Sequence, residues 1–131
     1  MSILYHISKK KLTKPLKPRI PKSDYEEQET PRVCFAKTIQ GCLIGVSEDK
    51  DISGEEFYVY KLKTDDYITP SKEQVNDVDI TGEVWYTKEY KPEFAFKIKI
   101  GNVKIHEKRK LNGRTVRVPI WDWKRESYFN Y

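Results

Sequence analysis

The chain of 131 residues has no long apolar segment. No run of apolar residues approaches the roughly 20 positions that a membrane-spanning helix needs. The first residues also lack the apolar core that is typical of a secretory signal peptide. We therefore expect a chain that has no membrane partner and that works in the cytoplasm.

Cysteine and histidine are scarce, with two of each. Cys34 and Cys42 fall on the apolar faces of one short strand-to-helix unit, so we expect two buried thiols. His6 and His106 are far apart, and His106 falls on the polar side of an alternating segment, where we expect it to be exposed to solvent. This set has none of the usual spacings of metal ligands, so we expect no metal site.

Apolar residues are few as well, at 37% of the chain against 34% charged residues. Aromatic residues make up 13%, and nine of them are tyrosines, which can bury an apolar ring while the hydroxyl stays polar. The length suits one domain, residues 1–131, with a C-terminal β-hairpin extension at about residues 101–131. The net charge of +5 is compatible with a nucleic acid or an anionic small molecule as partner, and is diagnostic of neither.

Residues 31–46 predict a buried strand that runs directly into an amphipathic helix. Val33 and Phe35 alternate with small residues, as in a strand. The helical face then consists of Ile39, Cys42, Leu43 and Val46. Thr38 precedes this face and is an expected N-cap. The unpaired N–H groups of such a helix start can bind a phosphate or carboxylate, although an ordinary corner with water on the cap is the commoner arrangement.

The remaining segments are mostly strand-like. We expect strands at residues 2–8, 56–61, 81–87, 94–100, 108–111 and 114–118, from their alternation and their β-branched or aromatic residues. In the segment 94–100 the expected buried face comprises Phe94, Phe96, Ile98 and Ile100. Gly101-Asn102 suggests a turn, and Asn112-Gly113 is a strong hairpin signal.

Two further segments are marked by proline. Residues 9–21 contain Pro15, Pro18 and Pro21 and therefore exclude a regular helix; we expect the end of this segment to run extended over the core. Pro70 begins a segment in which Ser71 and Gln74 have the spacing of a capping box, which predicts a single helical turn.

Three short motifs follow one another along the chain: Leu4-Tyr5-His6 on the first expected strand, residues 33–38 before the expected helix, and Gly82-Glu83 on a later expected strand. This order resembles the ADP-ribosyltransferase-like fold, in which a His, a Tyr, Ser or Thr, and a Glu from three strands surround a nicotinamide dinucleotide. The wider pattern also resembles a group of small uncharacterised phage and Firmicute proteins. The resemblance covers roughly residues 3–100 and implies an α+β fold: a split, mostly antiparallel sheet with one or two short helices.

The resemblance also implies roles for individual residues, with NAD as the cofactor. His6 would bind the ribose next to nicotinamide, and Glu83 would stabilise the oxocarbenium-like centre, so these two are the expected catalytic residues. The expected cofactor-binding residues are Tyr5 and Phe35 beside the nicotinamide ring, Thr38 beside the ring or the phosphates, and Arg19, Arg32 and Lys37 at the pyrophosphate.

The sequence departs from the family pattern at Thr81, where many members have Gln or Glu two residues before the catalytic glutamate. The resemblance therefore leaves open an NAD-dependent ADP-ribosyltransferase or an NAD glycohydrolase. An alternative is a non-catalytic phage accessory protein in the host cytoplasm, which would bind a nucleotide signal or block a host or defence protein.

A second alternative is a basic β-surface that binds RNA or DNA. Basic residues gather in the last third of the sequence: Lys97, Lys99, Lys104, Lys108, Arg109, Lys110, Arg114 and Arg117. Aromatic residues lie between them in the sequence. A solvated sheet face with the aromatic residues buried beneath it explains the same pattern, and on sequence alone we prefer that explanation to nucleic-acid binding.

Overall fold

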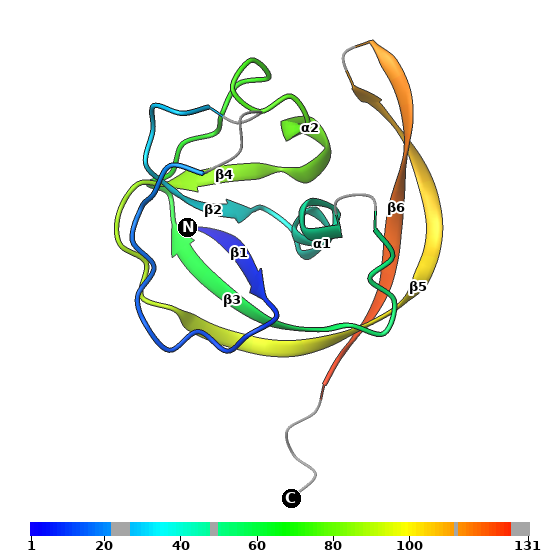
Figure 1. Ribbon diagram of the computed structural model, residues 1–131, viewed down its shortest axis with the longest axis horizontal. Helices are drawn as coiled ribbons and strands as arrows, with labels where there is room; N and C mark the ends of the chain where they lie inside the picture. The colour runs from blue at the N-terminus through cyan, green and yellow to red at the C-terminus, as the bar shows by residue number, and fades with distance from the viewer. Residues whose placement is uncertain (22–26, 48–49, 112, 127–131) are drawn as a thin grey trace, which may run out of the picture.

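The computed structural model describes residues 1–21, 27–47, 50–111 and 113–126. These residues form one antiparallel sheet with the strand order β4-β2-β1-β3-β5-β6, and two helices lie against it (Figure 1). The strands are β1 (Ser2–Ser8), β2 (Val33–Ala36), β3 (Glu56–Thr64), β4 (Glu83–Tyr86), β5 (Glu93–Leu111) and β6 (Arg114–Arg125). The helices are α1 (Ile39–Ser47) and α2 (Val78–Thr81). The predicted α+β class with a mostly antiparallel sheet is confirmed.

The sheet buries side chains on both faces, because alternate residues of each strand point to opposite sides. We call the face that packs against α1 the helical face. Its core comprises Leu43 of α1 with Phe57, Val59, Ile98, Ile100 and Trp121 of the strands, together with Ile52. The core of the opposite face comprises Leu4, Val33, Phe35, Tyr60, Val84 and Tyr90.

The proline-containing segment at residues 9–21 covers part of the opposite face without forming a helix, as predicted. Leu16 and Tyr90 exchange two backbone hydrogen bonds of 2.8 Å, and Leu12 N donates to Tyr60 Oη at 2.7 Å. Arg19 and Arg32 exchange a second backbone pair, of 3.1 and 3.0 Å. Prolines are compatible with this path because single bridges leave most N–H groups of the segment without a ladder partner.

The strand-to-helix unit at residues 31–46 is confirmed as β2 followed by α1. The side chain of Thr38 caps the helix, since its Oγ1 accepts a hydrogen bond from Gly41 N at 2.9 Å. Leu43 is fully buried, whereas Val46, which we expected on the same buried face, is 42% exposed. The difference arises because Val46 borders a cavity on the helical face.

The segment between β3 and β4 differs in part from the prediction. The capping box is confirmed, because Ser71 N donates to Gln74 Oε1 at 3.0 Å and Gln74 N donates to Ser71 Oγ at 3.3 Å. The predicted strand at 81–87 begins later, at Glu83, since residues up to Thr81 belong to helix α2. Gly82 ends this helix with a φ of 68°, a left-handed conformation that glycine adopts without strain.

Strand β5 also corrects two expectations. The predicted turn at Gly101-Asn102 is wrong: β5 continues through it, and the pairing with β6 is irregular between Ile100 and Val103. Phe94 is 43% exposed and lies beside Tyr58 and Tyr60, on the face opposite to Ile98. The pairing of β3 with β5 shifts by one residue at this point, and such a bulge reverses the alternation of the side chains.

Strands β5 and β6 form a long two-stranded ribbon that curves around one side of the molecule (Figure 1). Leu111 pairs with Arg114, and Gly113 has a φ of 77°, so the predicted hairpin forms, although Asn112 lies outside the described residues, as do residues 127–131. His106 is exposed on this ribbon, as expected. Among the residues that the structure describes, no helix is long and apolar enough to cross a membrane.

The close approach of α1 to α2 gives a testable prediction. A Cβ on Gly41 would lie 1.9 Å from the backbone oxygen of Thr81, whereas a Cβ on Gly45 would have no neighbour within 4 Å. Because a backbone oxygen cannot turn aside, Gly41→Ala should lower the free energy of unfolding by about 1–3 kcal/mol. Gly45→Ala is the matched control and should raise it by about 0.5–1 kcal/mol through helix propensity. Thermal unfolding of both variants checks the prediction, and equal Tm values would contradict the packing of α1 on α2.

Candidate functional site

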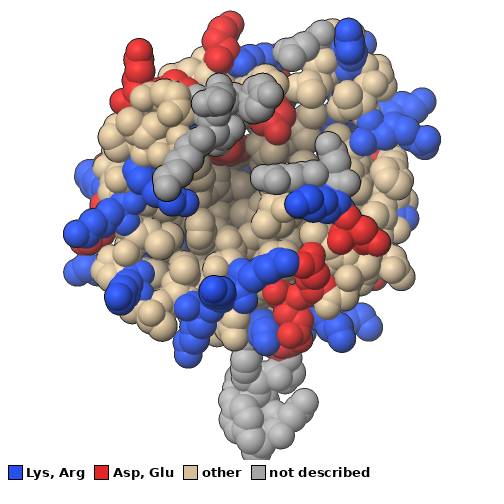
Figure 2. Space-filling view, in the orientation of Figure 1, with Lys and Arg blue, Asp and Glu red and all other residues tan. Residues whose placement is uncertain are grey.

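A cavity of about 510 Å³ opens on the helical face, between α1, the first two strands and the segment around α2. In the same view as Figure 1, the surface is hollowed near the middle of the molecule (Figure 2). The described residues that line the cavity are Tyr5, His6, Ile7, Cys34, Phe35, Ala36, Gly41, Cys42, Gly45, Val46, Val75, Asn76, Asp77, Thr81 and Glu83. Its volume lies within the range of about 300–1,000 Å³ that is usual for small-molecule sites.

The floor of the cavity lies where the sheet is open. Strands β1 and β2 have one registered pair, Tyr5 with Ala36, whereas β1 pairs with β3 along its whole length. Three consecutive residues of each strand border the cavity, Tyr5 to Ile7 and Cys34 to Ala36. Since consecutive side chains alternate between faces, the backbone of this gap forms part of the floor.

Side chains satisfy backbone groups at the gap. The Cys42 thiol donates to Tyr5 O at 3.3 Å. Burial raises the pKa of this thiol to about 12, so the side chain stays protonated and serves as a donor rather than a nucleophile. His6 Nδ1 donates to Cys34 O at 3.0 Å, because a carbonyl oxygen can only accept.

The imidazole of His6 is held from two sides. Besides its bond to Cys34 O, the ring lies edge-on to Phe35, with 5.7 Å between the ring centroids. Burial lowers the pKa of His6, and the bond to the Cys34 carbonyl opposes this only in part. The imidazole is therefore neutral at pH 7, with its proton on Nδ1.

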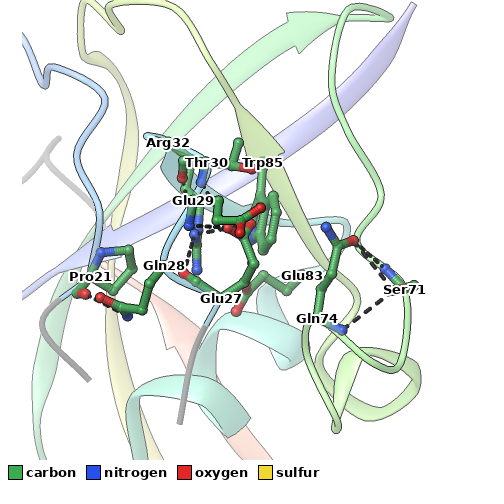
Figure 3. A network of polar contacts seen from close by, with 10 residues as sticks. All are labelled: Pro21, Glu27, Gln28, Glu29, Thr30, Arg32, Ser71, Gln74, Glu83 and Trp85. Carbon is green, nitrogen blue, oxygen red and sulfur yellow. Dashed lines mark hydrogen bonds and ion pairs between the residues drawn. The ribbon is translucent and has the colours of Figure 1, made fainter. Parts of the chain in front are cut away.

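Glu83 lies at the other side of the cavity, and its carboxylate is oriented by Trp85. Trp85 Nε1 donates to Glu83 Oε2 at 2.7 Å (Figure 3). The Arg32 guanidinium lies over the face of the Trp85 ring, with its central carbon 3.9 Å from the ring centroid. Arg32 is 2% exposed, and its Nη1 donates to the backbone oxygens of Glu27 and Thr30 at 2.8 and 3.0 Å. Arg32 thus packs on the Trp85 ring and is not among the described residues that line the cavity.

The cavity has an acidic lining. Asp77 and Glu83 contribute carboxylates and Asn76 an amide, whereas no Lys or Arg occurs among the described residues that line it. The remaining walls are largely apolar, from Ile7, Val46 and Val75. Such a site favours a ligand that carries a positive charge or hydrogen-bond donors, and disfavours a phosphate group.

The structure places the predicted site residues in two groups. Tyr5, His6, Phe35 and Glu83 border the cavity, although Phe35 belongs to the core of the opposite face and the His6 ring packs edge-on to it. The residues that do not border it are Arg19, Arg32, Lys37 and Thr38.

The residues of the second group lie elsewhere and make other contacts. Arg19 is exposed and pairs through its backbone with Arg32. Lys37 lines an adjacent hollow of about 420 Å³, which Lys72 and Glu83 also border. The Thr38 hydroxyl caps α1, and the first turn of this helix lies against Thr81.

Sequence reasoning missed the wall of the cavity formed by Val75, Asn76 and Asp77. These residues join a capped turn to α2, and they have no periodicity that would mark a site. The acidic character of Asp77 and Asp79 was a weak signal, because exposed acidic residues in a loop usually do no more than keep it solvated. Among the residues described, no group of three or more His, Cys, Asp and Glu could hold a metal ion.

Comparisons of the chain with protein-family models, with curated proteins and with solved structures find no match.

The buried neutral His6 gives a prediction about pH. The unfolded chain takes up a proton at His6 as the pH falls through about 6.5, whereas the native state does so only at a lower pH. Because the unfolded state binds more protons in this window, wild-type stability should fall from pH 7.5 to 5.5, with a slope of at most about 1.4 kcal/mol per pH unit from this residue.

Urea unfolding of wild type and His6→Asn across this range tests the prediction. Asparagine can still donate to Cys34 O, and its lack of titration should remove this part of the slope. His106→Asn, at an exposed position of the ribbon, should keep the wild-type slope. If His6→Asn also keeps it, His6 is not held neutral in the native state.

Proposed function

We propose that this chain binds NAD or a related nucleotide, and that the cavity on the helical face takes its nicotinamide–ribose end. The observation that carries the proposal is that Tyr5, His6, Phe35 and Glu83 border one cavity although they come from three strands. The gap between β1 and β2 supports the related proposal that the sheet is a split sheet of the ADP-ribosyltransferase-like kind.

The charge of the cavity favours the nicotinamide end. The nicotinamide ring of NAD carries a positive charge, and its carboxamide has two N–H donors. Glu83 and Asp77 offer carboxylate oxygens, and Glu83 is held in one orientation by Trp85. A fixed carboxylate in a partly enclosed site attracts a cation more strongly than one in bulk water does.

We expect the phosphates to lie outside the cavity, because its described lining contains carboxylates and no Lys or Arg. Arg19, Arg32 and Lys37, which we expected at the pyrophosphate, do not border the cavity. We therefore expect the nicotinamide and its ribose to contribute most of the affinity, with the pyrophosphate and adenosine extending toward solvent.

The prediction compares NAD with NADH, which have nearly the same shape but differ in the charge of the nicotinamide ring. Wild type should bind NAD about tenfold more tightly than NADH, a difference of about 1.4 kcal/mol. ADP-ribose, which lacks nicotinamide, should bind more weakly than NAD. Isothermal titration measures the three affinities, and a thermal shift provides a second readout, since a ligand at 100 times its Kd stabilises by about 2.7 kcal/mol.

Two variants identify the carboxylate. Glu83→Gln removes the charge but keeps an oxygen for the Trp85 indole, and it should reduce the preference for NAD over NADH to about twofold or less. Glu89→Gln removes an exposed carboxylate away from the cavity and should leave the preference unchanged. The proposal fails if no nucleotide stabilises the wild type, or if the two variants behave alike.

A second candidate is catalysis at the same site, as an NAD glycohydrolase or an ADP-ribosyltransferase. It is favoured by the position of Glu83, whose carboxylate is fixed beside the cavity that His6 also borders. Cleavage of the bond between nicotinamide and ribose sends the electron pair to nicotinamide and leaves an oxocarbenium-like ribose. A fixed carboxylate would stabilise that cation, and water or another acceptor would then attack it and release a proton.

This candidate predicts nicotinamide release from NAD by wild type and a loss of at least about 100-fold in rate for Glu83→Gln. Chromatography of the released nicotinamide provides the measurement, with Glu89→Gln as the control that keeps the wild-type rate. If wild type binds NAD but releases no nicotinamide, the domain is a binding module and the catalytic candidate is discarded.

A further inference from the structure

The outer part of the β5–β6 ribbon, residues 104–111 and 113–119, is strongly basic. We call this part the outer ribbon. Its basic residues are Lys104, Lys108, Arg109, Lys110, Arg114 and Arg117, and all of them are exposed. In the orientation of Figure 1, Figure 2 shows Lys and Arg gathered at the upper right, over the far end of this ribbon.

Most of these cations have no acidic partner. Arg109 forms an ion pair with Glu107 on the same strand. In the described part of the chain, Lys104, Lys108, Lys110, Arg114 and Arg117 form no ion pair. Elsewhere on the surface some lysines are paired, such as Lys72 with Asp79 at 2.8 Å and Lys88 with Asp66 at 2.7 Å, so the outer ribbon differs in how closely its unpaired cations are grouped.

The register of the ribbon places like charges together. Lys108 lies directly opposite Arg117, and Lys110 is opposite Thr115. Alternation puts Lys108, Lys110 and Arg117 on one face of the ribbon. Because like charges directly opposite each other destabilise a strand pair, this arrangement costs stability in the free protein. A polyanion that lies along this face would remove that cost.

We propose that the outer ribbon binds double-stranded DNA through its phosphates. A two-stranded antiparallel ribbon fits the major groove of B-form DNA, which is about 12 Å wide. The major groove of A-form RNA is deep and narrow and does not admit such an element. The exposed cations of the outer ribbon are suited to phosphate contacts, so the binding is expected to depend little on sequence and strongly on salt. This surface is separate from the acidic cavity, and the proposal does not rest on nucleotide binding there.

The test uses the full chain and a fluorescent 24-base-pair duplex of mixed sequence, with anisotropy measured from 50 to 200 mM salt. The logarithm of the association constant should fall with the logarithm of salt concentration, by about 0.9 for each phosphate contact. A variant of the outer ribbon, with Lys108→Gln, Lys110→Gln, Arg114→Gln and Arg117→Gln, should bind at least tenfold more weakly at 50 mM salt, with a shallower slope.

The matched control removes the same number of charges elsewhere: Lys14→Gln, Lys17→Gln, Lys63→Gln and Lys91→Gln. These lysines are exposed and lie outside the ribbon. Since both variants carry the same net charge, a loss confined to the ribbon variant supports the proposal, and an equal loss in both overturns it. A flat salt titration of the wild type, or tighter binding of double-stranded RNA or of a single strand of equal length, also overturns it.

Thermal unfolding accompanies both binding titrations. Because the ribbon variant relieves like-charge repulsion, its Tm should equal or exceed that of the wild type. A lower Tm for the ribbon variant would mean that these cations stabilise the free hairpin, and it would overturn the argument that they are held for a polyanion.

Discussion

The opening between β1 and β2 is the feature on which the site depends. A strand pair that separates leaves backbone N–H and C=O groups without partners, and buried groups of this kind are costly. Here two side chains replace ladder bonds: the His6 imidazole donates to Cys34 O, and the Cys42 thiol donates to Tyr5 O. The chain can therefore keep a gap next to its core, and the cavity forms where a continuous sheet would have been closed.

The walls of the cavity are held in position by the packing of buried residues behind them. Trp85 is fully buried between the Arg32 guanidinium and the Glu83 carboxylate, so the indole sets the position of a charged group that borders the cavity. On the other side, Gly41 allows α1 to approach Thr81 closely. A larger residue at this position would move α1 away from α2 and change the width of the cavity.

The local parts of this structure could be predicted from the sequence, and the parts that depend on long-range pairing could not. The Thr38 cap and the Ser71–Gln74 capping box are local patterns, and both form as expected. The face of Phe94 depends on a register shift against β3, and the separation of β1 from β2 depends on strands far apart in the sequence. Likewise, Tyr5, Phe35 and Glu83 could be proposed as site residues from a resemblance, but the acidic wall at Asp77 could not, because only the tertiary fold brings it to the cavity.

The modest net charge of +5 is the sum of charges that are unevenly distributed, and two surfaces of opposite sign result. The cavity presents carboxylates with no Lys or Arg among its described lining residues, while the outer ribbon presents cations of which only Arg109 is paired among the described residues. At physiological salt an exposed charge is screened beyond about 8 Å, so the two surfaces act as separate local fields rather than through the sum of the charges. A cationic ring in the cavity and a polyanion on the ribbon, as proposed, would therefore bind with little mutual interference, because the sign of each local field, not the net charge, would decide each interaction.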